Sequence, residues 1–208
     1  MKLNEKKCNF MIFSRSKTMF TTRLNMNNTN LDRISVTKLL GLWISEDLSW
    51  DLNTKAICRK AYSRLSMLTK LKYVGVSIED LLEIYVLFIR SITEYCAVAF
   101  HSSLTLEQTS NLERIQKTCL KVILNDNYIS YGSALEMTGL ETLQDCREKR
   151  CLNFARKCVA HPTNQCFFPL NNIHYREKFC VNHARTATYE KSTIPYCQRL
   201  LNSYFSSL

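Results

Sequence analysis

The chain has 208 residues, 46% of them apolar, and a formal net charge of +10, so the composition excludes wholesale disorder and allows one sizeable core or two small ones. The charge is uneven, because the first 72 residues hold 14 Lys and Arg against five Asp and Glu, whereas the remainder is nearly neutral. A basic segment joined to a near-neutral body is typical of proteins that bind a polyanion, since clustered cations release condensed counterions from phosphate backbones.

No segment has the composition of a signal peptide or a membrane span. The start of the chain, Met1–Phe13, has no uninterrupted apolar core, and the most apolar stretch, Ile84–Phe100, is broken by Arg90 and Glu94. We therefore expect an intracellular protein, nuclear or cytoplasmic, that does not enter membranes. Ten Cys without a secretory signal suggest a reducing compartment and thiols that are buried rather than bridged.

The N-terminal residues 8 to 44 have a β-like pattern. Cys8–Phe13 and Lys38–Ile44 are short apolar runs, and the Asn-rich stretch Asn25–Asn30 between them suits a turn. We expect a strand, a hairpin connection and a second strand.

From Trp50 onward, apolar residues recur at helical spacing and basic residues lie largely on the other side. The pattern predicts an amphipathic helix that ends at Gly75 and has a basic outer side. The apolar stripe consists of Ile57, Ala61, Leu65, Leu68 and Leu71. The basic residues are Lys55, Arg59, Lys60 and Arg64.

A second helix is predicted from Ile78 to about His101, because Ser77 and Asp80 resemble a capping box. It is apolar on most sides, which is typical of a helix at the centre of a bundle. Its main apolar stripe consists of Leu81, Tyr85, Phe88, Ile92, Tyr95 and Ala99.

Further helices are predicted in the second half of the chain. A capping-box pattern at Thr105 and Gln108 precedes a third helix, whose outer face carries Arg114, Lys117 and Lys121. A short helix is expected at Ala134–Met137 and a long one at Leu143–Ala160, whereas the Pro and Asn residues after His161 predict loops with a short terminal helix. The apolar stripe of the third helix is Leu112, Ile115, Cys119 and Val122.

These elements predict a mainly α fold, a helical bundle preceded by a small β hairpin or strand remnant. Three regions are expected along the chain: residues 1–49 with the strands, residues 50–125 with the bundle, and residues 126–208 with a helical, then irregular, extension.

Several segments in a fixed order resemble the C-terminal part of reverse transcriptases from non-LTR retrotransposons of the jockey and CR1 type. Leu3–Ser14 and Leu39–Trp50 resemble the end of the palm, Ile84–Tyr95 and Leu112–Lys117 the helices that follow it, and Ser192–Asn202 the C-terminal tail. The chain departs from the family at Phe100, where Trp is common, and in its many C-terminal Cys residues.

The resemblance implies that the palm end, a thumb-like bundle and a C-terminal extension are present, without the polymerase centre. Two-metal nucleotidyl transfer in this family uses adjacent carboxylates of a Tyr-x-Asp-Asp strand. The six Asp of this chain are nowhere adjacent, so this chain alone is expected not to polymerise nucleotides, and whether the protein is an enzyme stays open. The six residues are Asp32, Asp47, Asp51, Asp80, Asp126 and Asp145.

The resemblance also implies a partner, an RNA–DNA or DNA duplex that serves as template and primer. The hairpin before Leu42 would lie near the primer end, where Gly41 would allow close backbone approach, and the first helix would follow the phosphates. No small-molecule substrate is expected, and the sequence does not indicate an oligomeric state. The nucleic-acid-binding residues implied are Lys38, Gly41, Lys55, Arg59, Lys60, Arg64, Lys70 and Lys72.

A zinc site is the main alternative use of the C-terminal Cys residues, but the pattern lacks two paired ligands at each end and we expect no cofactor or metal. The residues concerned are Cys146, Cys151, Cys158, His161 and Cys166.

Two other interpretations stay open. In the first, the chain is a helical protein-interaction module or a decayed element without activity. In the second, it is a fragment of an active reverse transcriptase whose start is mispredicted.

Overall fold

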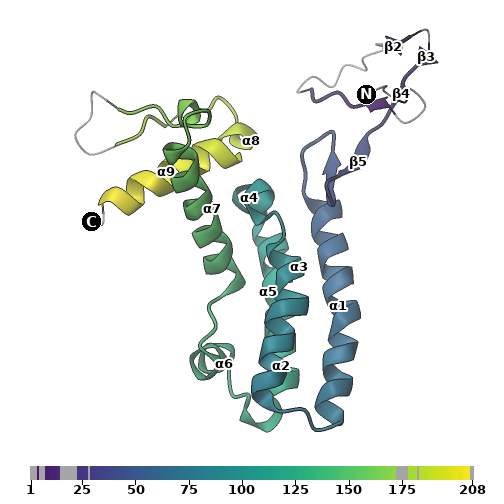
Figure 1. Cartoon of the computed structure of the whole chain (residues 1–208), viewed down its shortest axis with the longest axis vertical. Helices are drawn as coiled ribbons and strands as arrows, with labels where there is room; N and C mark the ends of the chain where they lie inside the picture. Colours follow the sequence, from purple (N-terminus) through teal and green to yellow (C-terminus); the bar gives the residue numbers. More distant parts are fainter. Residues whose placement is uncertain are drawn as a thin grey trace. The chain divides into compact units, whose positions relative to one another are not determined.

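The computed structural model describes residues 4, 8–14, 23–27, 29–171, 178–181 and 183–206. Leu3, at the start of the first segment of the family resemblance, lies outside these residues, as do the three lysines before Cys8. The fold is mainly α with short strands near the N-terminus, which confirms the predicted class (Figure 1). The chain forms two compact units, Met1–Lys55 and Ala56–Leu208, called unit 1 and unit 2 below.

Unit 1 contains three small strand pairs. The Asn-rich stretch turns the chain as predicted, because strand β2 (Asn25–Met26) pairs antiparallel with β3 (Thr29–Asn30). The first apolar run contributes only the two residues of β1 (Asn9–Phe10), which pair in parallel with β4 (Asp32–Arg33).

The second apolar run is not one strand, so the prediction of a single strand over Lys38–Ile44 is wrong. It contains a hairpin, in which β5 (Val36–Leu39) pairs antiparallel with β6 (Leu42–Ser45). Leu39 faces Leu42, which leaves Leu40 and Gly41 as a two-residue turn with φ angles of 47° and 91°. A type I′ turn requires positive φ angles at both residues. Glycine adopts such an angle without steric cost, so the turn itself explains why position 41 is glycine.

Replacing Leu40 with Asn should stabilise this hairpin. Leu40 is 82% exposed and packs little, yet it holds a left-handed backbone that Asn tolerates much better. We expect the free energy of unfolding of unit 1 to rise by about 1 kcal/mol, measured by urea denaturation with Trp43 and Trp50 as fluorescent reporters. Leu39→Asn is the matched control, because Leu39 is also exposed but lies in a strand; an equal gain there would contradict the strain at Leu40.

The first predicted helix is confirmed as α1 (Asp51–Tyr73). Ile57, Ala61 and Leu68 are buried, as their stripe predicts. The helix ends at Gly75, whose φ is 88°, with hydrogen bonds from the Gly75 amide to the Lys72 carbonyl (3.1 Å) and from the Val76 amide to the Leu71 carbonyl (3.2 Å). These two bonds form a Schellman motif, which satisfies carbonyls at the end of the helix.

The second predicted helix is not continuous. It begins at its predicted cap, where the Ser77 hydroxyl accepts from the Asp80 amide, but it contains a π-helix and then a break. At the break, Cys96 adopts a left-handed φ of 51°. The segments in order are α2 (Ile78–Ile84), the π-helix η2 (Tyr85–Arg90), α3 (Ser91–Glu94) and α4 (Ala97–Phe100).

Three positions of the predicted core stripe are wrong, because Phe88, Tyr95 and Ala99 are exposed, and the π-helix explains the first of them. Its wider turn places the residue four positions after Tyr85, Ile89, in the core, whereas Phe88 is half-exposed. The predicted stripe assumed ordinary α-helical spacing, and that assumption fails in η2.

The third predicted helix is α5 (Leu106–Leu124), and it follows the short 3-10 turn η3 (His101–Ser103). Both bonds of its capping box are present, so the prediction at Thr105 and Gln108 is confirmed. Its predicted inner residues Leu112, Ile115 and Cys119 are buried. The 3-10 turn η4 (Asn125–Asn127) and helix α6 (Tyr131–Thr138) follow.

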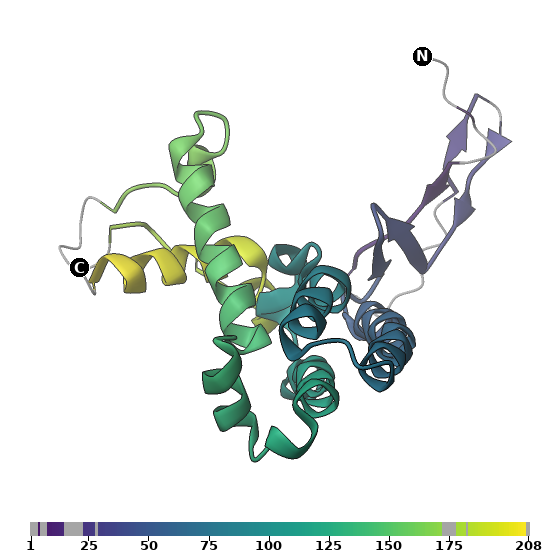
Figure 2. The same cartoon turned by 60° about the horizontal axis from the view of Figure 1, so that its bottom comes forward.

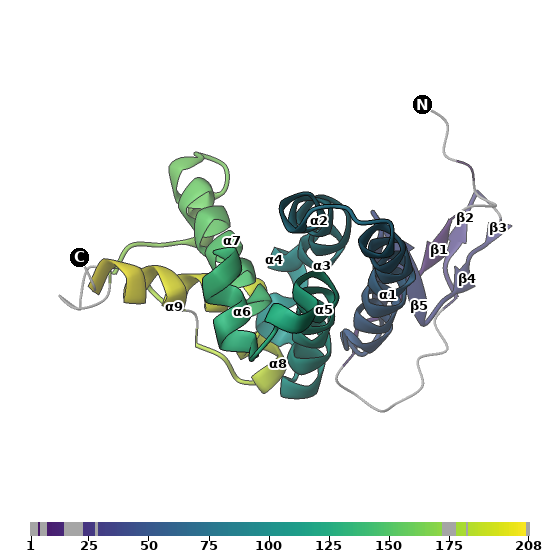
Figure 3. The ribbon, with the colours of Figure 1, turned by 90° about the horizontal axis from the view of Figure 1, so that it is seen from below.

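Helix α7 (Leu143–Ala160) has the predicted bounds and is the central helix of unit 2. It contacts α3, α4, α5 and the last helix. Figures 1 and 3 show α2, α3 and α5 between the unit 2 part of α1 and α7.

The described part of the C-terminal region is more helical than predicted. Instead of a short terminal helix it has α9 (Thr193–Ser206), which lies across α7 and buries Cys197 and Leu201 (Figure 2). The Asn202 side chain exchanges two hydrogen bonds of 2.9 Å with the backbone of Phe179 and so ties the preceding loop to this helix. The other short elements are η5 (Gln165–Phe167) and α8 (Ala187–Glu190).

Candidate nucleic-acid interface

Helix α1 presents three of the predicted cations to solvent within unit 2. Arg59, Lys60 and Lys70 are exposed, because the apolar stripe of the same helix packs inward. None of the ion pairs among the described residues includes any of the three. Their charge is therefore available to an external anion.

Two other predicted residues of α1 have structural roles. Arg64 is half-buried, and its Nη1 donates a hydrogen bond of 2.7 Å to the Phe88 carbonyl, so that it joins α1 to η2. Lys72 is half-buried in the last turn of α1, where a cation interacts favourably with the negative end of the helix dipole. These two residues are less available to a phosphate than Arg59, Lys60 and Lys70.

The remaining predicted residues belong to unit 1. The Lys38 ammonium lies 5.7 Å from the ring centroid of Trp43, its partner across the β5–β6 hairpin, in a cation–π contact. Gly41 is in the turn, and Lys55 is an exposed residue of α1. The predicted residues thus fall into two sets, one in each unit, and a single surface made from both stays a prediction.

Arg114 of α5 adds a positive charge beside α1 that the sequence analysis did not include in the site. Burial raises the pKa of the Cys58 thiol on α1, and Arg114 is near enough to oppose that shift. The third-helix pattern identified Arg114 as an outward residue, but no sequence pattern shows that α5 brings it near α1.

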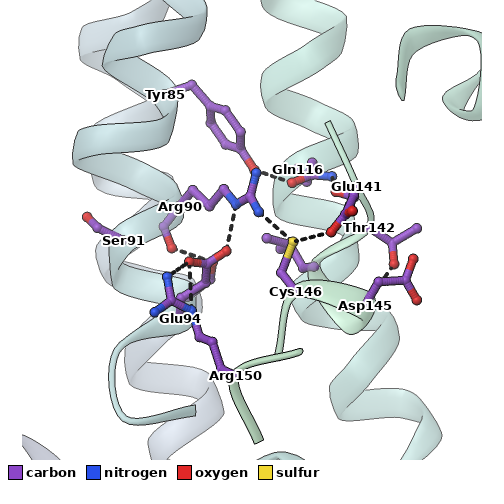
Figure 4. Close-up of polar contacts among 12 residues, drawn as sticks. Tyr85, Arg90, Ser91, Glu94, Gln116, Glu141, Thr142, Asp145, Cys146 and Arg150 are labelled. Atoms are coloured by element: carbon purple, nitrogen blue, oxygen red, sulfur yellow. Dashed lines mark hydrogen bonds and ion pairs between the residues drawn. The ribbon is translucent and has the colours of Figure 1, made fainter. Parts of the chain in front are cut away.

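A cluster of charges joins η2 and α3 to α7 and pairs some of the other cations of unit 2 (Figure 4). Glu94 is buried and accepts a 2.6 Å hydrogen bond from Nε of Arg90 and two hydrogen bonds from Arg150. The exposed Lys149 is paired with Glu141. These basic groups are neutralised within the protein, in contrast to those on the outer side of α1.

Cys146 belongs to the same cluster, in the first turn of α7 (Figure 4). Its Sγ lies 2.5 Å from Nη2 of Arg90. Burial raises the pKa of Cys146 and the Arg90 charge only partly opposes that shift, so the group stays a thiol near neutral pH. A buried thiol is not a nucleophile, and Cys146 is best understood as part of the packing.

Most of the zinc candidates also pack in the interior, whereas Cys166 is exposed. Cys151 and Cys158 lie in one apolar cluster with Cys197, and burial raises the pKa of Cys151 to about 12. Metals bind thiolates, so this environment opposes zinc binding. All ten Cys residues are free, and the described part of the chain has no group of three or more His, Cys, Asp or Glu that could hold a metal ion.

No family model, curated protein or solved structure matches this chain. Within the residues that the structure describes, no helix has the length and apolar character needed to cross a membrane.

Proposed function

We propose that the chain is a nucleic-acid-binding C-terminal fragment of a non-LTR retrotransposon reverse transcriptase, which holds an RNA–DNA or DNA duplex and transfers no nucleotides by itself. The observation that carries this proposal is the set of exposed α1 cations, Arg59, Lys60 and Lys70, which form no ion pair among the described residues. The ordered resemblance of five segments to the family supports it.

An electrostatic grip of this kind suits a polymerase fragment. Phosphate contacts fix the position of a nucleic acid without reading its sequence, and they allow the chain to move along it. A helix holds the backbone of these cations at a regular spacing before a nucleic acid binds.

The sequence does not contain the motif that carries nucleotidyl transfer in this family. The two-metal centre of the family uses the adjacent carboxylates of a Tyr-x-Asp-Asp strand, and no such segment occurs in these 208 residues. We therefore assign this chain to binding, and any chemistry to a palm that it does not contain.

Binding to a blunt RNA–DNA duplex should depend strongly on salt. Contacts from the three exposed α1 cations of unit 2 give an expected slope of about −3 in a plot of log affinity against log salt concentration. Arg59→Ala and Lys60→Ala should each flatten the slope by about one unit, measured by fluorescence anisotropy. Lys157→Ala removes an exposed lysine from α7 and serves as the control, with no expected change. Affinity that is independent of salt would rule out the proposal.

A helical protein-interaction module is the second candidate, and one observation favours it. Val86, Leu87 and Phe88 are three consecutive apolar residues of η2 that are all exposed. An apolar surface of this kind is typical of a protein-binding site. Weakened partner binding after Phe88→Ser, with nucleic-acid binding absent, would favour this candidate.

A further inference from the structure

Two tyrosines lie in line with the exposed cations on the outer side of α1. Arg59, Tyr62, Ser66, Lys70 and Tyr73 follow one another at intervals of three or four residues, so they form one stripe along the helix, called here the basic–aromatic stripe. Tyr73 is 93% exposed and Tyr62 is 39% exposed. All five residues belong to unit 2.

Other aromatic rings that lie beside cations in unit 2 are used internally. The Lys117 ammonium is 4.9 Å from the ring centroid of Tyr131, and the Lys121 ammonium is 5.5 Å from that of Tyr128. Among the described residues, neither ring of the basic–aromatic stripe takes part in a ring contact or cation–π contact. The basic–aromatic stripe therefore offers aromatic rings as well as positive charge to an external ligand.

We propose that the basic–aromatic stripe binds single-stranded nucleic acid, with bases stacked on Tyr62 and Tyr73 and phosphates held by Arg59 and Lys70. This inference rests on the proposed function and specifies the form of nucleic acid that unit 2 prefers. Sequence-tolerant binding of single strands combines a basic track with aromatic side chains on which bases stack.

The dimensions of the stripe agree with this ligand. Tyr62 and Tyr73 are eleven residues apart, as are Arg59 and Lys70, and a rise of 1.5 Å per residue separates each pair by about 16 Å. At roughly 3.4 Å per nucleotide this length corresponds to about five nucleotides of one strand. A duplex offers phosphates to the two cations but keeps its base faces stacked inside, so the tyrosines would contribute little to binding it.

The test compares a short mixed-sequence single strand with a blunt duplex of the same length, using the full chain and fluorescence anisotropy over a range of salt concentrations. We expect tighter binding of the single strand. Tyr62→Leu and Tyr73→Leu should each weaken single-strand binding about tenfold, because one stacked base is lost, and should change duplex binding less than twofold. Tyr73→Phe keeps the π-face and should bind as the parent does.

The outcomes separate this inference from the proposed function. If the Tyr→Leu variants bind the single strand as the parent does, or if the duplex binds equally well or better, the stripe does not bind unpaired bases. Salt-dependent binding in that case would leave the proposed function standing, whereas binding to neither ligand would remove both. Both tyrosines are exposed, so circular dichroism should show unchanged helix content in every variant.

Discussion

Replacing Glu94 with Ala is expected to lower the free energy of unfolding of unit 2 by about 3 kcal/mol. Glu94 is buried at the end of α3 and carries the only negative charge that directly pairs with Arg90 or Arg150 among the described residues. Without it, the mostly buried guanidinium of Arg90 keeps its desolvation cost and loses its ion pair. The estimate is at the low end of the range for broken buried pairs, since about half of the Arg150 side chain is in solvent.

Urea denaturation followed by circular dichroism would measure this loss. Lys149→Ala is the matched control, because it removes one member of an exposed pair and should not move the midpoint measurably. Adding Arg90→Met to Glu94→Leu should recover much of the loss, since the double variant removes both charges of the Arg90–Glu94 pair together. An equal loss in the double variant would indicate that the positions matter through packing alone.

The sequence predicts those helices whose ends and faces are determined locally. Helix α5 begins at a capping box formed by Thr105 and Gln108. Helix α1 ends at Gly75, whose left-handed conformation completes a Schellman motif. Both helices also have an apolar stripe at regular spacing. The information for such elements lies within one or two turns of chain.

The break after α3 could not be predicted in this way. Glu94 is bonded to Arg150, which is 56 residues further along the chain, and the backbone leaves the helix at the next two residues. The pattern of apolar residues continues through this point and so favours an uninterrupted helix. A contact made only in the folded state coincides with the place where the local pattern fails.

Proline misled the prediction at the C-terminus. Pro195 favours irregular chain in a sequence pattern, but it is in the first turn of α9, where a missing amide costs no hydrogen bond within the helix. The sequence does not predict the β5–β6 hairpin, because the residues of its turn do not have the usual turn composition. Leu40 is an unusual residue for a type I′ turn, so the run from Lys38 to Ile44 has the composition of one strand.

The sequence predicts which residues of the candidate site are charged, but not which of these charges are bonded within the protein. Arg59, Lys60 and Lys70 are exposed, as an amphipathic helix requires. Arg64 has the same sequence signal, yet its side chain is bonded to a carbonyl of η2. Tertiary contacts of this kind depend on which helix packs against α1. The residue pattern of a single sequence does not show that packing.

Replacing Arg147 with Met is expected to leave unit 2 equally stable or to stabilise it by up to about 4 kcal/mol. Arg147 has no solvent exposure, and its Nη1 and Nη2 have no hydrogen-bond partner among the described residues. Burial lowers the pKa of Arg147, and Glu113 opposes that shift without forming an ion pair. A buried charge in this condition is costly, and Met fills a similar volume without one. A marked loss of stability would show that attraction to Glu113 outweighs desolvation.

The pH dependence of stability offers a second test at the same place. Nε of Arg147 donates to Nδ1 of His101 at 3.4 Å, so His101 is neutral with its proton on Nε2, which faces the Tyr196 hydroxyl at 3.3 Å. Burial, and then the Arg147 charge, lower the pKa of His101 to about 4.

In the unfolded chain the His101 imidazole therefore binds a proton near pH 6.5, whereas in the folded chain it binds one only near pH 4. The contribution of His101 to stability is complete above pH 6.5 and decreases as the pH falls toward 4, by at most about 1.4 kcal/mol per pH unit. Arg147→Met removes the neighbouring charge and should raise the pKa of His101, which makes this acid loss smaller. Titration of the imidazole by NMR, together with urea denaturation at pH 7 and pH 5, measures both effects. An unchanged His101 pKa would mean that burial alone accounts for its shift, and that Arg147 acts on stability without acting on this histidine.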